Sequence, residues 1–154
     1  MKKGLYILVP VLFFVIISYL LPNEKVTTET VSVPMPVDAV TRVMTNQQEW
    51  AKWFPGTKKN DSTYLYYEAP ITIHKVLMNG FKATMINKDM NISLDFFFFF
   101  FNNARTDFTL NTVMKLSFNP ILRFKQFLSL NAAEDDSKRL LYQIQDYFSD
   151  VLKV

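Results

Sequence analysis

The hydrophobic pattern of the sequence changes its period once, at Asn119-Pro120, and this change limits the possible folds more than any other feature. Before it, residues 106–118 alternate between apolar and polar side chains, which is typical of a strand with one face on a core and one face in water. After it, apolar residues recur every three or four positions as far as Leu152, which is typical of an amphipathic helix. We therefore expect a sheet followed by a long C-terminal helix.

More strands and two short helices are expected ahead of this pair. Residues 26–33 are rich in β-branched side chains, and Pro34 and Pro36 end that strand. Two short helices follow, over residues 36–44 and 47–54. Further strands are expected over residues 63–68, 71–78, 81–87 and 91–101. Asn79-Gly80 is a strong signal for a hairpin turn. This order indicates an α+β fold in which one curved antiparallel sheet wraps around one helix.

The apolar residues of the last two elements are expected to face each other. On the final strand they are Phe108, Leu110, Met114, Leu116 and Phe118. On the final helix they are Leu140, Leu141, Ile144, Tyr147, Phe148, Val151 and Leu152. Pro120 is expected to begin a helical turn with Ile121, Phe124, Lys125 and Leu128. Asn131-Ala-Ala-Glu134 resembles a capping box, so a helix N-terminus is also expected at Asn131.

The N-terminal segment is unusual because residues 5–21 contain no charged side chain. A helix of that length is about 25 Å long, at the short end of what spans a bilayer. We therefore expect residues 1–22 to be a single-pass membrane anchor and residues 23–154 to be the folded domain. Lys2 and Lys3 then place the N-terminus in the cytoplasm and the domain on the extracytoplasmic side. A cleaved signal peptide and a buried helix of a soluble protein remain as alternatives.

Composition excludes several classes of function. The sequence has no cysteine, which removes disulfides, iron–sulfur sites and thiol nucleophiles, and it has one histidine, His74. Three glycines leave no phosphate-binding glycine loop. The net charge of +3 is too small for the basic stripe of a nucleic-acid-binding protein. We expect no metal, no cofactor and no nucleic-acid partner.

Three segments of the sequence carry a resemblance to a known family. They are Val31-Ser-Val-Pro-Met-Pro-Val-Asp-Ala-Val40, Trp50-Ala-Lys-Trp53 with Pro55-Gly56, and Asn119-Pro120-Ile-Leu-Arg123. Together they resemble the START-like superfamily, also called SRPBCC or the polyketide cyclase/dehydrase and lipid-transport group, in its membrane-anchored bacterial form. Met35 departs from the small residue usual before Pro36. The resemblance covers about residues 26–153 and implies the helix-grip fold, in which the sheet and the long helix enclose an apolar cavity.

The resemblance implies that the domain binds a hydrophobic or lipid-like small molecule without catalysis, held near the membrane by residues 5–21. The residues expected to line the cavity are Trp53, Phe54, His74, Met85, Met114, Phe124, Ile144 and Phe148. Two alternatives stay open. One is a structural or protein-interaction module with a filled core, and the other is an enzyme of the cyclase/dehydrase type, for which no catalytic residue set is evident.

A run of six phenylalanines, Phe96–Phe101, would place side chains on both faces of its strand. One set faces the interior: Phe96, Phe98 and Phe100. The other set lies on the polar face: Phe97, Phe99 and Phe101. Three exposed rings would form an apolar patch that implies a protein partner, a dimer or a bilayer surface, unless a bulge or a covering loop buries them.

Overall fold

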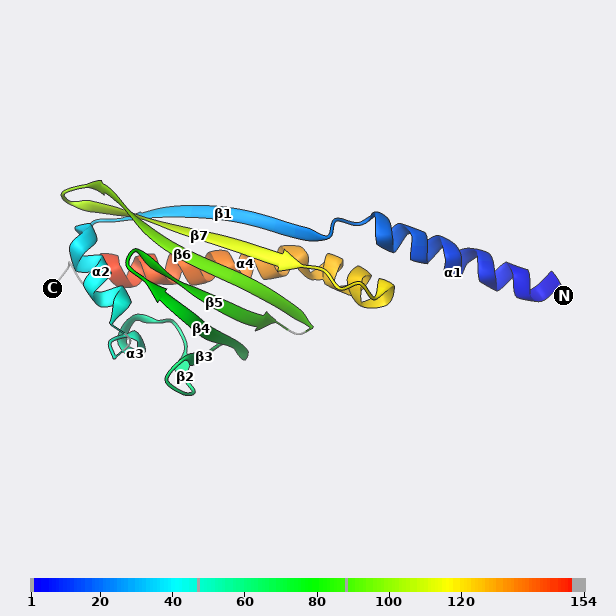
Figure 1. Ribbon diagram of the computed structural model, residues 1–154, viewed down its shortest axis with the longest axis horizontal. Helices are drawn as coiled ribbons and strands as arrows, with labels where there is room; N and C mark the ends of the chain where they lie inside the picture. Colours follow the sequence, from blue (N-terminus) through cyan, green and yellow to red (C-terminus); the bar gives the residue numbers. More distant parts are fainter. Residues whose placement is uncertain (1, 47, 88, 151–154) are drawn as a thin grey trace.

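The computed structural model describes residues 2–46, 48–87 and 89–150, with side chains from Val9 onward. The elements, in chain order, are α1 (Lys2–Leu20), β1 (Glu24–Val33), α2 (Val37–Thr45), α3 (Trp50–Trp53), β2 (Thr57–Lys58), β3 (Thr63–Tyr66), β4 (Ala69–Leu77), β5 (Gly80–Asn87), β6 (Met90–Asn102), β7 (Arg105–Lys115) and α4 (Pro120–Asp150). The strands form one curved antiparallel sheet in the order β1-β7-β6-β5-β4-β3-β2. α4 runs along one face of the sheet, and α2 and α3 lie at one end (Figure 1). The predicted α+β arrangement of a sheet around a long helix is confirmed.

The inner face of the sheet follows the sequence alternation. Phe108, Leu110, Met114 and Leu116 are buried, as the pattern of residues 106–118 predicts. Phe118 differs from the prediction, because β7 ends at Lys115 and the Phe118 side chain is 85% exposed. Its carbonyl accepts a hydrogen bond from the Tyr19 hydroxyl instead.

α4 is one continuous helix of 31 residues and does not begin again at Asn131. Its N-cap is Asn119, whose Oδ1 accepts hydrogen bonds from the backbone amides of Ile121 and Leu122, with Pro120 at the first helical position. Asn131 and Glu134 lie in mid-helix and contact Lys25 of β1. The capping-box prediction is therefore wrong, since these polar residues serve a contact between the helix and the sheet. Val151 and Leu152 lie outside the described residues.

The hairpin between β4 and β5 is present, but Gly80 has a different role from the one predicted. Leu77 pairs with Gly80, so the two turn residues are Met78 and Asn79, and Gly80 is the first residue of β5. Gly80 has no positive φ. It is needed because its Cα lies against the backbone of Phe96 on the neighbouring strand, where a side chain has no room.

The C-terminal end of α1 packs against the start of α4. Ser18 is buried, and its hydroxyl donates to the Pro120 carbonyl at 2.8 Å. The Phe14 ring lies 5.3 Å from the Phe124 ring in an edge-on contact. Arg123 is also buried and donates to the carbonyl of Leu21. The last turns of α1 are thus held by α4, while the rest of α1 extends away from the sheet (Figure 1).

The prediction of a single-pass membrane anchor is wrong. Within the part of the chain that the structure describes, no helix combines the length and the apolar character needed to cross a bilayer. Phe14 and Ser18 of α1 contact α4. The predicted cytoplasmic N-terminus and extracytoplasmic domain lose their basis with the anchor, and the side chains of Lys2 and Lys3 lie outside the described residues.

We expect Gly80→Ala to destabilise the fold by about 2 kcal/mol or more, because a Cβ atom at this position would overlap the Phe96 carbonyl oxygen. Urea unfolding followed by circular dichroism measures the change in the free energy of unfolding. Met78→Ala, in the same turn, is the control. The Met78 side chain is 91% exposed, and its truncation should change the stability by less than about 0.5 kcal/mol. Equal urea midpoints for Gly80→Ala and the wild type would contradict the close approach.

A second prediction concerns the ion pairs that hold β1 to α4. Glu134 contacts Lys25 and Lys138, and these two ammonium groups lower the pKa of the Glu134 carboxyl below its ordinary value of 4.5. The carboxylate therefore adds stability above about pH 4.5, and this contribution is lost as the pH falls through the lowered pKa. We expect Glu134→Gln to reduce the loss of stability on acidification, measured as thermal midpoints between pH 3 and pH 7. Asp135→Asn, at an exposed position one residue along, should reduce it less; equal slopes in the two variants would refute the prediction.

Candidate functional site

An aromatic cluster fills the space between the sheet and α4 at the end that holds α3. Its members are Trp50, Trp53, Phe54, Tyr64, Phe81, Phe96 and Phe148. The two tryptophans lie three positions apart on α3, so both rings can face the interior. Neighbouring rings are 4.4 Å (Phe81 and Phe96) to 6.4 Å (Trp50 and Tyr64) apart between centroids. The Trp50 indole nitrogen donates to the Met44 carbonyl at 2.7 Å, which ties α3 to the end of α2.

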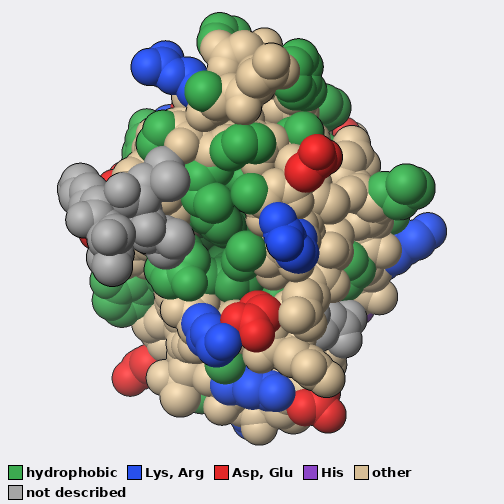
Figure 2. Space-filling model, turned by 90° about the vertical axis from the view of Figure 1, so that its left-hand side faces the viewer, with side chains coloured by type: hydrophobic (Ala, Val, Ile, Leu, Met, Phe, Trp, Pro, Cys, Tyr) green, Lys and Arg blue, Asp and Glu red, His purple; other side chains and the backbone are tan. Residues whose placement is uncertain are grey.

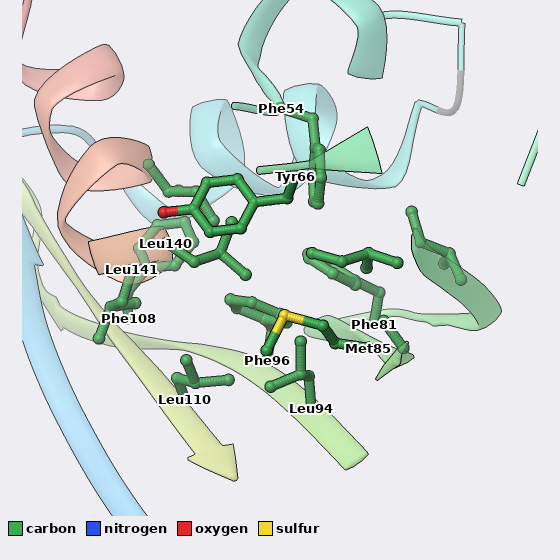
Figure 3. Packing of buried hydrophobic residues seen from close by; sticks show 14 of the residues in the cluster. Phe54, Tyr66, Phe81, Met85, Leu94, Phe96, Phe108, Leu110, Leu140 and Leu141 are labelled. Atoms are coloured by element: carbon green, nitrogen blue, oxygen red, sulfur yellow. The ribbon is translucent and has the colours of Figure 1, made fainter. Parts of the chain in front are cut away.

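Four methionines share this interior with the aromatic rings: Met44, Met85, Met90 and Met114, all buried. Figure 3 shows Phe81, Met85 and Phe96 pointing into the same space as Leu140 of α4. Methionine is flexible and polarisable, so a core rich in it can change its packing with little loss of contact. The interior is therefore apolar and adaptable.

The structure brings together six of the eight residues predicted to line a cavity. Trp53, Phe54, Met85, Met114, Ile144 and Phe148 all belong to the buried core. Phe124 is half-buried beside Phe14 of α1. His74 is exposed on the outer face of the sheet, where its Nε2 lies 2.9 Å from the Thr84 hydroxyl. The pairing of β4 with β5 shifts its register between Ile73 and Lys75, at this point. Contact of these residues with a ligand stays a prediction.

Four buried polar atoms near the α3 end have no hydrogen-bond partner within the described part of the chain. They are Trp53 Nε1, the hydroxyls of Tyr64 and Tyr66, and Gln143 Oε1. Nearly all buried polar groups in proteins are hydrogen-bonded, so unpaired ones require an explanation. Burial raises the pKa of the Tyr64 phenol, and it raises that of Tyr66 to about 12. Both tyrosines are therefore neutral hydrogen-bond donors at physiological pH.

Sequence reasoning missed Tyr64, Tyr66 and Gln143. The pattern Thr-Tyr-Leu-Tyr of residues 63–66 contains a usable signal, because strand alternation places both tyrosines on one face. Buried tyrosine hydroxyls usually have a hydrogen-bond partner, so two of them on the inner face of one strand are worth checking for partners. No comparable sequence signal marks Gln143, whose burial depends on the packing of α4.

The interior of the grip is largely filled by side chains. The pocket at its mouth, between the β5–β6 turn and α4, has a volume of about 120 Å³ and is lined in part by Met90, Gln126 and Ala133. A second pocket of about 450 Å³ lies at the edge of β3 beside α4. A third, of about 730 Å³, is a groove on the outer face of the sheet that includes His74. Trp53, Met85 and Phe148 line none of these three, so the aromatic cluster occupies the space where a ligand cavity was expected.

The phenylalanine run divides between the core and the surface. Phe96 and Phe98 are buried, as predicted, and Phe97 is half-buried on the opposite face. Phe99 and Phe101 are 48% and 57% exposed, and Phe100, predicted to be internal, is 62% exposed. The β6–β7 hairpin extends past α2 at this end (Figure 1), and the described part of the chain leaves the Phe100 side chain uncovered. Figure 2 views this end of the molecule, where hydrophobic side chains are visible at the top and in the middle of the face.

Comparison with known proteins gives the fold its name. No protein-family model and no curated protein matches the sequence. The Zhui aromatase/cyclase from Streptomyces sp. R1128 has a similar structure, with a TM-score of 0.59 at 13% identity, covering 84% of this chain and 94% of that chain. The di-domain ARO/CYC StfQ from the steffimycin biosynthetic pathway gives a TM-score of 0.57 at 8% identity, over 85% of this chain and 53% of that chain. Ara h 8.0201 gives 0.50 at 8% identity, over 81% of this chain and 97% of that one.

These likenesses show the fold alone, because the identities are low. The chain has a START-like (SRPBCC) fold, with the sheet and the long C-terminal helix arranged as a helix grip. The resemblance found in the sequence is therefore confirmed at the level of the fold.

The unpaired hydroxyl of Tyr64 leads to a stability prediction. We expect Tyr64→Phe to leave the stability unchanged or to raise it by up to about 1 kcal/mol, because the change removes a buried polar atom that has no partner. Trp50→Phe is the contrasting variant. It loses the hydrogen bond to the Met44 carbonyl and leaves a void, so it should destabilise the protein by about 2 kcal/mol or more. Thermal and urea unfolding measure both changes. A large loss of stability in Tyr64→Phe would mean that the hydroxyl has a partner after all.

Proposed function

We propose that this domain binds a hydrophobic small molecule that carries polar atoms, in the space between the inner face of the sheet and α4, without catalysing a reaction. The observation that carries the proposal is the pair of unpaired donors, Trp53 Nε1 and the Tyr64 hydroxyl, inside the apolar cluster. Both rings contact Phe54, so the two donors border the same part of the interior. A ligand with oxygen or nitrogen acceptors would give them the partners that the protein does not supply.

A filled interior can admit such a ligand if its cover moves. At the α3 end the cover consists of a four-residue helix, α3, followed by a two-residue strand, β2. Short elements of this kind have few backbone hydrogen bonds and open at lower free energy than the long strands. Outward movement of Trp53 and Phe54 would open the space that their rings fill, and the buried methionines would adjust to the shape of the guest. Ligand binding would then stabilise an open state that is a minor one in the free protein.

The polar groups of the interior support binding more than chemistry. The buried polar side chains of the described residues are Ser18, Thr106, Thr112, Arg123, Gln126 and Ser137, in addition to the unpaired groups named above. General acid–base catalysis needs titratable groups that converge on one pocket, and these residues do not form such a pair. An enzyme of the cyclase/dehydrase type is compatible with the fold, and it stays the weaker hypothesis.

A second candidate function is protein interaction through the β6–β7 hairpin. The exposed rings of Phe99, Phe100 and Phe101 favour it, because three successive large apolar side chains are exposed near the tip of one hairpin. The filled interior is compatible with this function, because binding through an exposed surface requires no cavity.

Native mass spectrometry of the full-length chain, purified gently, tests the proposal. We expect a bound small molecule at close to one per chain, which denaturation releases and lipid or metabolite analysis identifies. The double variant Trp53→Phe/Tyr64→Phe should lower the occupancy several-fold, because it removes both donors. Tyr142→Phe is the matched control, since Tyr142 is exposed on α4 and its variant should retain full occupancy.

Two outcomes would refute ligand binding in the interior. One is an empty protein that shows no thermal shift with a panel of lipids and apolar small molecules. The other is equal occupancy in the double variant and the wild type. A dimer in the same spectra that disappears in Phe99→Ser/Phe101→Ser would favour the interaction module.

A further inference from the structure

A pocket of about 450 Å³ lies at the edge of the grip, where β3 and the β3–β4 turn face α4. Leu65, Tyr66 and Tyr67 line it from the strand and the turn, Gly56 lines it from the segment after α3, and Gln143 lines it from α4. The pocket opens to solvent, whereas Tyr66 reaches from it into the core with only 3% of its side chain exposed. This residue thus connects the pocket with the interior. We call it the β3–α4 pocket.

Two of the unpaired polar atoms belong to residues of this pocket. They are the Tyr66 hydroxyl and Gln143 Oε1, both buried and both without a hydrogen-bond partner among the described residues. Figure 3 shows the Tyr66 hydroxyl pointing toward α4, close to Leu140, and Gln143 lies three positions further along that helix. Burial raises the pKa of Tyr66 to about 12, so the phenol keeps its proton and donates. The Gln143 oxygen can only accept. The protein uses neither atom, and both are shielded from solvent behind the wall of the pocket, so outward movement of α3 and β2 would make one donor and one acceptor available to a ligand.

The β3–β4 turn beside the pocket has a strained backbone, and it carries the exposed ring of Tyr67. Tyr66 pairs with Ala69, so Tyr67 and Glu68 form a two-residue hairpin turn, and both have positive φ values, 43° and 69°. Glycine and asparagine are the residues that usually adopt this conformation, and neither is present here. The turn holds the Tyr67 ring 4.8 Å from the Tyr66 ring, edge-on, while 74% of Tyr67 stays exposed. Strain of this kind occurs at sites that hold a ligand, and the exposed ring offers an apolar wall at the mouth of the pocket.

We propose that the β3–α4 pocket holds one polar end of the ligand, and that this end is a neutral group with an acceptor atom and a donor atom side by side, such as a carboxamide or a hydroxyketone. The acceptor atom would accept a hydrogen bond from the Tyr66 hydroxyl, and the donor atom would donate one to Gln143 Oε1. An ionised carboxylate fits less well, because it would bring a second acceptor against the Gln143 oxygen. This inference rests on the proposed function, since it names the chemical class of that same ligand.

The remainder of the ligand would extend from the pocket into the aromatic cluster. Tyr64 and Tyr66 lie on the same inner face of β3, two positions apart, which corresponds to about 7 Å along a strand. The Tyr64 hydroxyl and Trp53 Nε1 are both donors. A ligand that satisfies all four unpaired atoms would therefore carry a mixed donor and acceptor group at one end, an apolar ring or chain, and an acceptor further in.

Three probes that share one apolar ring system test the inference on the full-length protein. Naphthalene-2-carboxamide has the donor and the acceptor, 2-acetonaphthone has the acceptor only, and 2-naphthoate is an anion with acceptors only. Isothermal titration calorimetry gives the affinity of each for the wild type, Tyr66→Phe, Gln143→Leu and the control Tyr142→Phe. We expect the carboxamide to bind the wild type about tenfold more tightly than either of the other probes, which corresponds to one or two additional hydrogen bonds.

The two variants should separate the two hydrogen bonds. Tyr66→Phe should weaken the carboxamide and the ketone by about fivefold each, because both use the phenol as donor. Gln143→Leu should weaken the carboxamide by a similar factor and leave the ketone unchanged, since the ketone has no proton to give. Tyr142→Phe should leave all three affinities as in the wild type. Thermal unfolding provides the folding check, and Tyr66→Phe should be at least as stable as the wild type.

The outcomes distinguish this inference from the function on which it rests. Equal affinities of the three probes for the wild type, or a carboxamide affinity that neither variant changes, would overturn the donor–acceptor pocket and leave ligand binding in the interior standing. Failure of every probe to bind, together with an empty protein in native mass spectrometry, would overturn both. Retention of the tenfold preference in the Gln143→Leu variant would assign the preference to another residue and would also overturn the inference.

Discussion

The contact between α4 and the inner face of the sheet is the interaction on which the rest of the structure depends. β6 and β7 supply alternate apolar side chains along most of their length, and α4 covers them with Leu140, Leu141, Ile144 and Phe148. The burial of apolar surface is the main source of stability here. At the β1 edge the contact is polar: Lys25 and Glu29 of β1 pair with Glu134 and Lys138 of α4. These pairs are partly exposed, so they set the position of the helix more than they add to the stability.

The two edges of the grip are therefore built differently. The β1 edge is a ten-residue strand held along α4 by charged pairs, whereas the opposite edge ends in the four-residue β3 and the two-residue β2. At this edge the core is covered by the aromatic side chains of α3, whereas at the β1 edge a long strand covers it. The unpaired polar atoms of Trp53, Tyr64, Tyr66 and Gln143 gather at this same edge. The shortest strands of the sheet thus lie at the same edge as these unpaired atoms, which on the proposed function would form hydrogen bonds with the ligand.

The sequence predicts those features that depend on local periodicity. The alternation of residues 106–118 places Phe108, Leu110 and Met114 correctly on the inner face, and the change of period at Asn119-Pro120 marks the start of α4. Features that depend on distant partners were missed. Asn131 and Glu134 read as a helix cap, but they contact Lys25, more than one hundred positions away in the sequence. Phe100 lies on the inner side of its strand, but the hairpin is longer than the elements that cover it, and only the three-dimensional structure shows that.

The candidate site is also predictable only in part, because some of its features depend on local sequence and others on contacts between distant residues. Trp53 and Phe54 stand out as large aromatic residues beside a turn, and the structure places both in the core. Whether a buried hydroxyl finds a partner is a property of the assembled interior, so no local pattern could identify Tyr64 and Tyr66 as unpaired. Each unpaired group costs about 1–3 kcal/mol in the closed state, and several of them together are large against the 5–15 kcal/mol by which a domain is usually stable. On the proposed function, a ligand that provides the missing partners would recover this free energy on binding and so offset the cost of moving α3 away from the core. The unpaired polar atoms would then favour the open, ligand-bound state over the filled one.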